Sequence, residues 1–128
     1  MSKLDNLGNV LIRSDLNVPI KNGEITDNFR ILKSVEVLKN YVDFYKIASY
    51  ELNWKELLEA CAKTKKPVIL STGMATYEEV KKAYKILKKY NNKISLLHCV
   101  SAYPASPVSC NLKSIDFLRK KFGCPVGW

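Results

Sequence analysis

Short apolar runs alternate with longer amphipathic segments along most of the chain. The apolar runs predict strands, and the amphipathic segments predict helices because their apolar residues recur every three or four positions. The five predicted strands lie at residues 9–16, 44–49, 66–73, 93–100 and 125–128. A strand–helix alternation with short loops is typical of an α/β fold with a parallel sheet and right-handed crossovers. The alternation does not distinguish an open sheet from a partial TIM-like barrel.

Polar residues in helix-capping patterns predict where three of the helices begin. Asn53 with Glu56 three residues later predicts the start of the helix after the second strand, and Thr76 with Glu79 predicts the start of the next. Both pairs have the spacing of a capping box, in which two side chains satisfy free backbone N–H groups. Asn111 is predicted to cap the last helix.

The second predicted strand contains a charge where an apolar residue is expected. Its sequence, YKIASYE over residues 45–51, has Lys46 in the middle and Ser49 and Glu51 at its end. Strands of parallel sheets are normally covered by helices on both faces, and a buried ammonium group is costly unless an anion compensates it. We therefore expect both faces of this strand to be covered. Either Lys46 extends to solvent at the edge of the sheet, or a negatively charged ligand binds at the end of the strand.

Further polar residues follow the next two strands. Ser71 and Thr72 end the third strand, and His98, Ser101 and Tyr103 follow the fourth. Ligand sites of parallel sheets lie outside the carboxyl ends of the strands, so this edge is the predicted site. Ser71 and Thr72 are expected to close the strand-to-helix turn, and His98 is expected to satisfy a hydrogen bond in the core.

Composition narrows the class of protein. The 128 residues suffice for one ordinary domain, and the net charge is +9. The lysines alternate with apolar residues on helix surfaces without interleaved stacking aromatics, so no nucleic-acid binding is predicted. No apolar run approaches the ~20 residues of a membrane span. Four cysteines without a C-x-x-C pair and a single histidine predict reduced thiols, no zinc site and a cytoplasmic location.

Four motifs in the second part of the chain carry a family resemblance. In chain order they are DFYKIASYE, KPVILSTGMAT, LLHCVSAYP and FGCPVGW. From about residue 42 to the end, the chain thereby resembles the sialic acid synthase (N-acetylneuraminate synthase) family. The resemblance implies a TIM barrel that condenses phosphoenolpyruvate with an N-acetylated amino sugar, and a divalent metal, Mn or Mg, as cofactor.

The resemblance also implies roles for individual residues. Lys46 and Ser49 match the family residues that hold the phosphate of phosphoenolpyruvate, and Glu51 matches the catalytic glutamate that faces the sugar. Ser101 and Tyr103 match substrate contacts. The family's metal-binding histidines fall beyond the matched segment, so no metal ligand is predicted here. The implied protein is a fragment of such a synthase that is inactive alone.

A second resemblance concerns the start of the chain. The segment NVLIRSDLNVPIKNGEITDNFRI resembles the N-terminus of phosphoglycerate kinase. Asp15 and Asn17 then match residues that bind 3-phosphoglycerate, and Arg30 matches the arginine that stabilises the transferring phosphoryl group.

Together the two resemblances predict a chimera. Residues 1–41 form a kinase-like βα unit, with the resemblance strongest over 7–31, and residues 42–128 form part of a synthase-like barrel. A kinase remnant that binds 3-phosphoglycerate and a non-catalytic basic domain are the alternative functions. An incomplete barrel leaves a strand edge unpaired, which predicts self-association.

Overall fold

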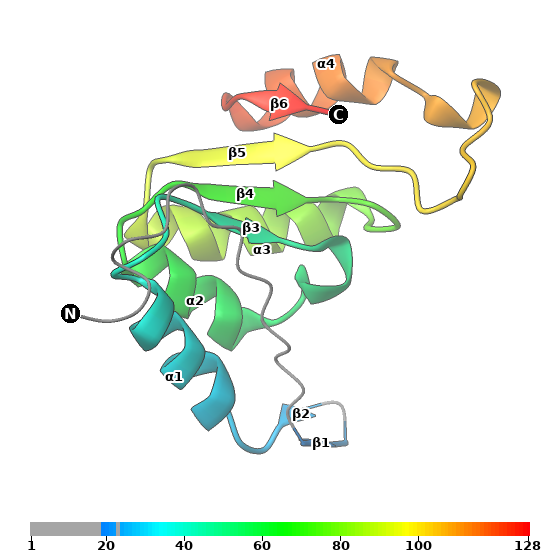
Figure 1. Ribbon diagram of the computed structural model, residues 1–128. Coiled ribbons are helices and arrows are strands. Elements are labelled where there is room, and N and C mark those ends of the chain that lie inside the picture. The colour runs from blue at the N-terminus through cyan, green and yellow to red at the C-terminus, as the bar shows by residue number, and fades with distance from the viewer. Residues whose placement is uncertain (1–18, 23) are drawn as a thin grey trace. The chain divides into compact units, whose positions relative to one another are not determined.

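The computed structural model describes residues 19–22 and 24–128, and its chain divides into two compact units after Val42 (Figure 1). The described elements of the first unit are β1 (Ile20–Lys21), β2 (Glu24–Ile25) and α1 (Phe29–Leu38). β1 and β2 pair antiparallel, a small hairpin that the apolar pattern did not predict. The strand predicted at 9–16 lies outside the described residues.

Helix α1 has the apolar face that its sequence predicts. Ile31 and Val35 are buried, and Leu38 is half-buried. The Asp27 carboxylate accepts a hydrogen bond from the Phe29 N–H at 2.8 Å, which satisfies one of the free donors at the start of the helix.

No helix among the described residues is long and apolar enough to cross a bilayer.

The second unit alternates strands and helices as predicted. Its strands are β3 (Tyr45–Ile47), β4 (Val68–Ser71), β5 (Ile94–Leu97) and β6 (Val126–Gly127). Its helices are α2 (Lys55–Lys63), α3 (Tyr77–Tyr90) and α4 (Lys113–Phe122), with short 3-10 turns at Ser49–Glu51 and Val108–Cys110. The four strands form one parallel sheet in the order β3-β4-β5-β6, which confirms the α/β fold.

The strand order decides where the helices lie. Each strand pairs with the next one along the chain, so every crossover moves in the same direction across the sheet. Because such crossovers are right-handed, all the connecting helices fall on one face, as in a TIM barrel. In Figure 1, α2 and α3 accordingly run along the same side of the sheet. An open doubly wound sheet instead needs a reversal of strand order.

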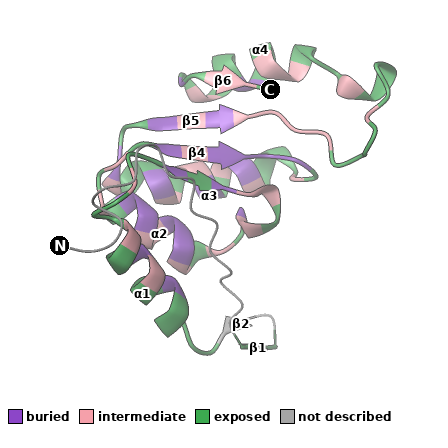
Figure 2. Ribbon diagram, viewed as in Figure 1, coloured by how far each residue is buried: buried purple, intermediate pink, exposed green. Residues whose placement is uncertain are grey.

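Burial along the strands follows from this one-sided cover. Alternate residues of β3, β4 and β5 are buried, and their neighbours are exposed or half-buried, except Ser71 at the end of β4, which is buried too (Figure 2). The buried set is Tyr45, Ile47, Val68, Leu70, Ile94 and Leu96. The other set, Lys46, Ile69, Ser95 and Leu97, points to the face without helices. The expectation that helices cover both faces of the second strand is therefore wrong for the helices of the second unit.

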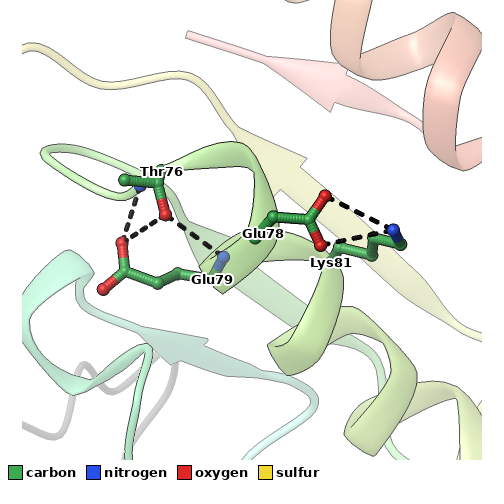
Figure 3. A network of polar contacts seen from close by, with 4 residues as sticks. All are labelled: Thr76, Glu78, Glu79 and Lys81. Carbon is green, nitrogen blue, oxygen red and sulfur yellow. Dashed lines mark hydrogen bonds and ion pairs between the residues drawn. The ribbon is translucent and has the colours of Figure 1, made fainter.

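The predicted helix starts are correct in one case of three. Thr76 and Glu79 form the predicted capping box at α3 (Figure 3). Helix α2 instead begins after Trp54 without a side-chain cap, so the prediction that Asn53 caps it is wrong. Asn111 does not cap α4 with its side chain, because it takes a left-handed conformation (φ 38°) and its carbonyl accepts from the Ser114 N–H.

One-sided burial predicts unequal costs for neighbouring truncations on β4. Leu70→Ala should lower the free energy of unfolding by about 2–5 kcal/mol, since the side chain is fully buried beneath the helices. Ile69→Ala removes a half-buried side chain on the opposite face and should cost less than half as much. Urea unfolding followed by circular dichroism measures both values. Equal losses would show that both faces of the sheet are covered.

Candidate functional site

The loops that follow three consecutive strands meet at Gly73. A Cβ atom at this position would lie 2.9 Å from the Ser49 Oγ, 2.9 Å from the Ser101 Oγ and 3.2 Å from the Cys99 Cβ. Ser49 follows β3, Gly73 follows β4, and Cys99 and Ser101 follow β5. The predicted polar edge of the sheet therefore exists, and its two serine hydroxyls flank one buried glycine.

The Ser49 hydroxyl is held in a defined orientation. Its Oγ accepts a hydrogen bond from the Gly73 N–H at 2.9 Å. An oxygen that accepts from a backbone N–H keeps its own proton available, so Ser49 can still donate to an anion. The backbone of Gly73 does not have a positive φ, so its conformation is open to other residues. Glycine is required here because a side chain would collide with the neighbouring loops.

Lys46 lies on the uncovered face of the sheet. Its side chain is exposed, and it forms no ion pair with any described residue. The expected cost of burying this ammonium therefore does not arise here. The charge instead faces open space two residues before the turn that carries Ser49, where an anion can approach it.

Glu51 has one carboxylate oxygen engaged. Its Oε2 accepts a hydrogen bond from the Ala48 N–H at 2.9 Å, which closes the short turn that contains Ser49. The side chain is half-buried, and its charge contributes to raising the pKa of the nearby Cys61 thiol. Glu51 thus shapes the Ser49 turn, and its other oxygen forms no hydrogen bond with a described residue. Its predicted catalytic role remains a prediction.

Of the two predicted substrate contacts after β5, only Ser101 reaches the loop junction. Ser101 is exposed, with its Oγ beside Gly73. The Tyr103 side chain is 95% exposed and lies in the loop that leads to Val108–Cys110. Its predicted contact with a substrate remains a prediction.

Ser71 was expected only to close a turn, and the structure shows an additional feature. Its side chain is 3% exposed, and its Oγ has no hydrogen-bond partner among the described residues. Thr72, in contrast, fulfils the turn-closing role by donating from Oγ1 to the Leu97 carbonyl at 2.9 Å. By strand alternation Ser71 lies on the same face of the sheet as Lys46, but unlike Lys46 it is buried. A serine that ends an otherwise apolar strand was the sequence signal for this position.

His98 is used in local packing, as expected. Its Nε2 lies 2.8 Å from the Cys110 carbonyl, and its ring meets the edge of Trp128 at a centroid distance of 5.4 Å. Among the described residues no group of three or more His, Cys, Asp or Glu side chains could hold a metal ion.

The kinase-like candidates belong to the first part of the chain. Asp15 and Asn17 fall outside the described part of the chain. Arg30 is exposed in the first turn of α1, within the first compact unit.

Comparison with known proteins gives one family and several partial relatives. The model of the NeuB family matches residues 28–128. Pseudaminic acid synthase of Helicobacter pylori is 45% identical over 84 residues, covering 65% of this chain and 25% of that protein. N-acetylneuraminate-9-phosphate synthase of Mus musculus is 36% identical over 88 residues, covering 68% of this chain and 24% of the mouse protein.

A solved structure agrees with these sequence matches. The N-acetylneuraminic acid (sialic acid) synthetase of Leptospira borgpetersenii, in complex with citrate, superposes with a TM-score of 0.71 and 39% identity. The superposition covers 75% of this chain and 34% of that one. The chain therefore spans between about a quarter and a third of the length of these relatives.

These matches also move the predicted family boundary. The match starts at residue 28, not at 42, and so includes α1 and Arg30. Arg30, which the second resemblance places in the kinase-like unit, therefore lies within the NeuB match. The matches give no support to a phosphoglycerate kinase portion or to a chimera.

The packing around Gly73 predicts that a single methyl group disturbs the site. Gly73→Ala should destabilise the chain by about 1–3 kcal/mol, because the added Cβ overlaps both serine hydroxyls and breaks the Ser49 hydrogen bond. Urea unfolding measures the loss. In a Ser49→Ala/Ser101→Ala background the same change should cost less, since the overlapping oxygens are gone. An equal cost in both backgrounds would show that the hydroxyls do not crowd this position.

The cysteines are predicted to differ in reactivity. Burial raises the pKa of the Cys61 thiol to about 12, so almost none of it is the nucleophilic thiolate at pH 8. Burial likewise raises the pKa of Cys124. Iodoacetamide at pH 8 should therefore label the half-buried Cys99 and Cys110 first, as peptide mass spectrometry would show. Labelling of Cys61 in the folded chain at the same rate would contradict the buried environment.

Proposed function

Because the chain belongs to the NeuB family, we propose that it carries the phosphate-binding part of a site for phosphoenolpyruvate. The whole protein would condense phosphoenolpyruvate with an N-acetylated amino sugar. The observation that supports this proposal is the meeting of Ser49 and Ser101 at Gly73, at the carboxyl ends of three parallel strands. The two relatives described above are named for different sugar acids, so the proposal does not choose the sugar.

The chemistry of these side chains suits a phosphate group. Hydrogen bonds from hydroxyl and ammonium donors to an ionised oxygen are roughly twice as strong as those between neutral groups. Ser49 and Ser101 supply hydroxyl donors, and Lys46 supplies a positive charge on the adjoining open face. This set would fix the phosphate and leave the enol carbon free to react.

The remaining roles follow from position. Glu51 has one oxygen bound to the Ala48 N–H, and its second oxygen would orient the sugar or a water molecule. Tyr103 would contact the sugar from the exposed loop. NeuB enzymes use a divalent metal, proposed here to be Mn or Mg. The described residues do not fit a metal site, so no step is assigned to the ion in this segment.

The proposal predicts selective binding of phosphoenolpyruvate by the chain. Isothermal titration should detect binding that Lys46→Ala weakens by about tenfold or more, because the variant loses a charge-assisted contact with the phosphate. The matched control is Lys85→Ala, which removes an exposed lysine of α3 and should leave the affinity unchanged. 3-Phosphoglycerate is the comparison ligand and should bind more weakly.

Two outcomes would contradict the proposal. If the unmodified chain does not bind phosphoenolpyruvate, the proposed phosphate site does not exist in it. Equal weakening by Lys46→Ala and Lys85→Ala, with steep loss of affinity as salt rises, would indicate non-specific attraction of anions by a basic surface.

A further inference from the structure

A side-chain hydrogen bond joins the two loops that carry Ser49 and Gly73. The Asn53 Nδ2 donates to the Glu79 Oε1 at 3.1 Å. Asn53 lies between the Ser49 turn and α2, and Glu79 lies in the first turn of α3, just after the Gly73 loop. The same two loops are therefore linked twice, once by the Ser49–Gly73 hydrogen bond and once by this side-chain pair.

The Glu79 carboxylate is fixed before it meets Asn53. Its Oε2 accepts from the Thr76 N–H at 2.7 Å and from the Thr76 Oγ1 at 2.8 Å (Figure 3). The Thr76 Oγ1 also accepts from the Glu79 N–H at 3.3 Å. The bonds from Thr76 to the carboxylate, with the one from Asn53, lower the pKa of Glu79, so the carboxylate is ionised at neutral pH. The capping box of α3 thus holds one oxygen and presents the other to Asn53.

Asn53 does not cap α2, although its position in the sequence favours that role. Asparagine just before a helix usually caps it, yet α2 begins without any side-chain cap. The Asn53 amide instead donates across to the neighbouring loop, 26 residues further along the chain. Within the turn, the Glu51–Ala48 side-chain bond and backbone hydrogen bonds fix the local conformation. The hydrogen bonds that link the turn to the Gly73 loop and to the start of α3 are the Ser49–Gly73 bond and the Asn53–Glu79 bond.

We propose that Asn53 and Glu79 form a latch that fixes the separation of the two loops and so positions Ser49 against Gly73. Both are positioning residues, since neither is among the residues that would touch the phosphate. Through this separation the latch sets the affinity for phosphoenolpyruvate, a consequence that rests on the proposed function. The latch itself is a property of the folded chain and is testable without ligand.

Amide hydrogen exchange of Gly73, measured by NMR on the full chain, tests the latch directly. Asn53→Ala removes the donor, so the Gly73 amide should exchange about three to ten times faster, as expected for the loss of one exposed charge-assisted hydrogen bond. The amides of β4 should keep their rates. The matched control is Glu78→Gln, which breaks the neighbouring ion pair with Lys81 (3.2 Å) and leaves Glu79 in place. It should leave Gly73 exchange unchanged.

Asn53→Asp adds a pH profile that general destabilisation would not produce. At neutral pH the introduced carboxylate faces Glu79, and the repulsion should speed Gly73 exchange beyond its rate in Asn53→Ala. On acidification one of the two facing carboxyl groups takes up a proton, which removes the repulsion and lets the neutral acid donate a hydrogen bond to the other. The excess exchange, corrected for the intrinsic pH dependence, should disappear below about pH 4. Both variants share the same charged residues nearby along the chain: Glu51, Lys55, Glu56, Glu78, Lys81 and Lys82.

Ligand titration completes the experiment. In Asn53→Ala the affinity for phosphoenolpyruvate should fall about three- to tenfold, the same factor by which Gly73 amide exchange is expected to rise. In Glu78→Gln the affinity should be unchanged. If Gly73 exchange in Asn53→Ala rises no more than that of the β4 amides, the latch is wrong. If the unmodified chain binds no phosphoenolpyruvate, the proposed function fails, and Gly73 exchange alone then decides the latch.

Discussion

The absence of a side chain at Gly73 is the constraint on which the candidate site depends. Two serine hydroxyls and the Cys99 Cβ occupy the space around the position where a Cβ would be. Three loops can approach one another only because this position is empty, and the backbone N–H that it exposes orients Ser49. The site is therefore built first from close backbone packing and only then from donors and charge.

The topology of the sheet supplies the rest of the arrangement. Strands that pair in chain order deliver their carboxyl ends to neighbouring positions, so residues far apart in sequence gather along one edge. The same order keeps the helices on one face and leaves Lys46 on the other. A positive charge thus lies on the exposed face of the strand that leads to Ser49, as the proposed phosphate site requires.

The sequence was sufficient to predict the four described parallel strands, the meeting of Ser49 and Ser101 at one edge of the sheet, and the NeuB family, which the comparisons confirm. The kinase-like first part and the chimera that it also predicted have no support in the comparisons. Predictions from the sequence were wrong where the conformation of a residue depends on residues distant in the chain. The exposure of Lys46 follows from the order of the strands in the sheet, and hydrophobic periodicity does not predict that order. Asn53 has the local spacing of a helix cap, and only the folded arrangement brings Glu79 within its reach.

The pairing of each strand with its successor also bears on how this chain folds. The register joins Val68 to Ile94 and Leu96 to Val126, so each ladder closes a loop of only one helix and its connections. Such short-range closure has a modest entropic cost, and folding rates rise as contacts become more local. The sheet can consequently grow one βα unit at a time, much as stacked repeats do, with fraying expected to begin at an outer unit.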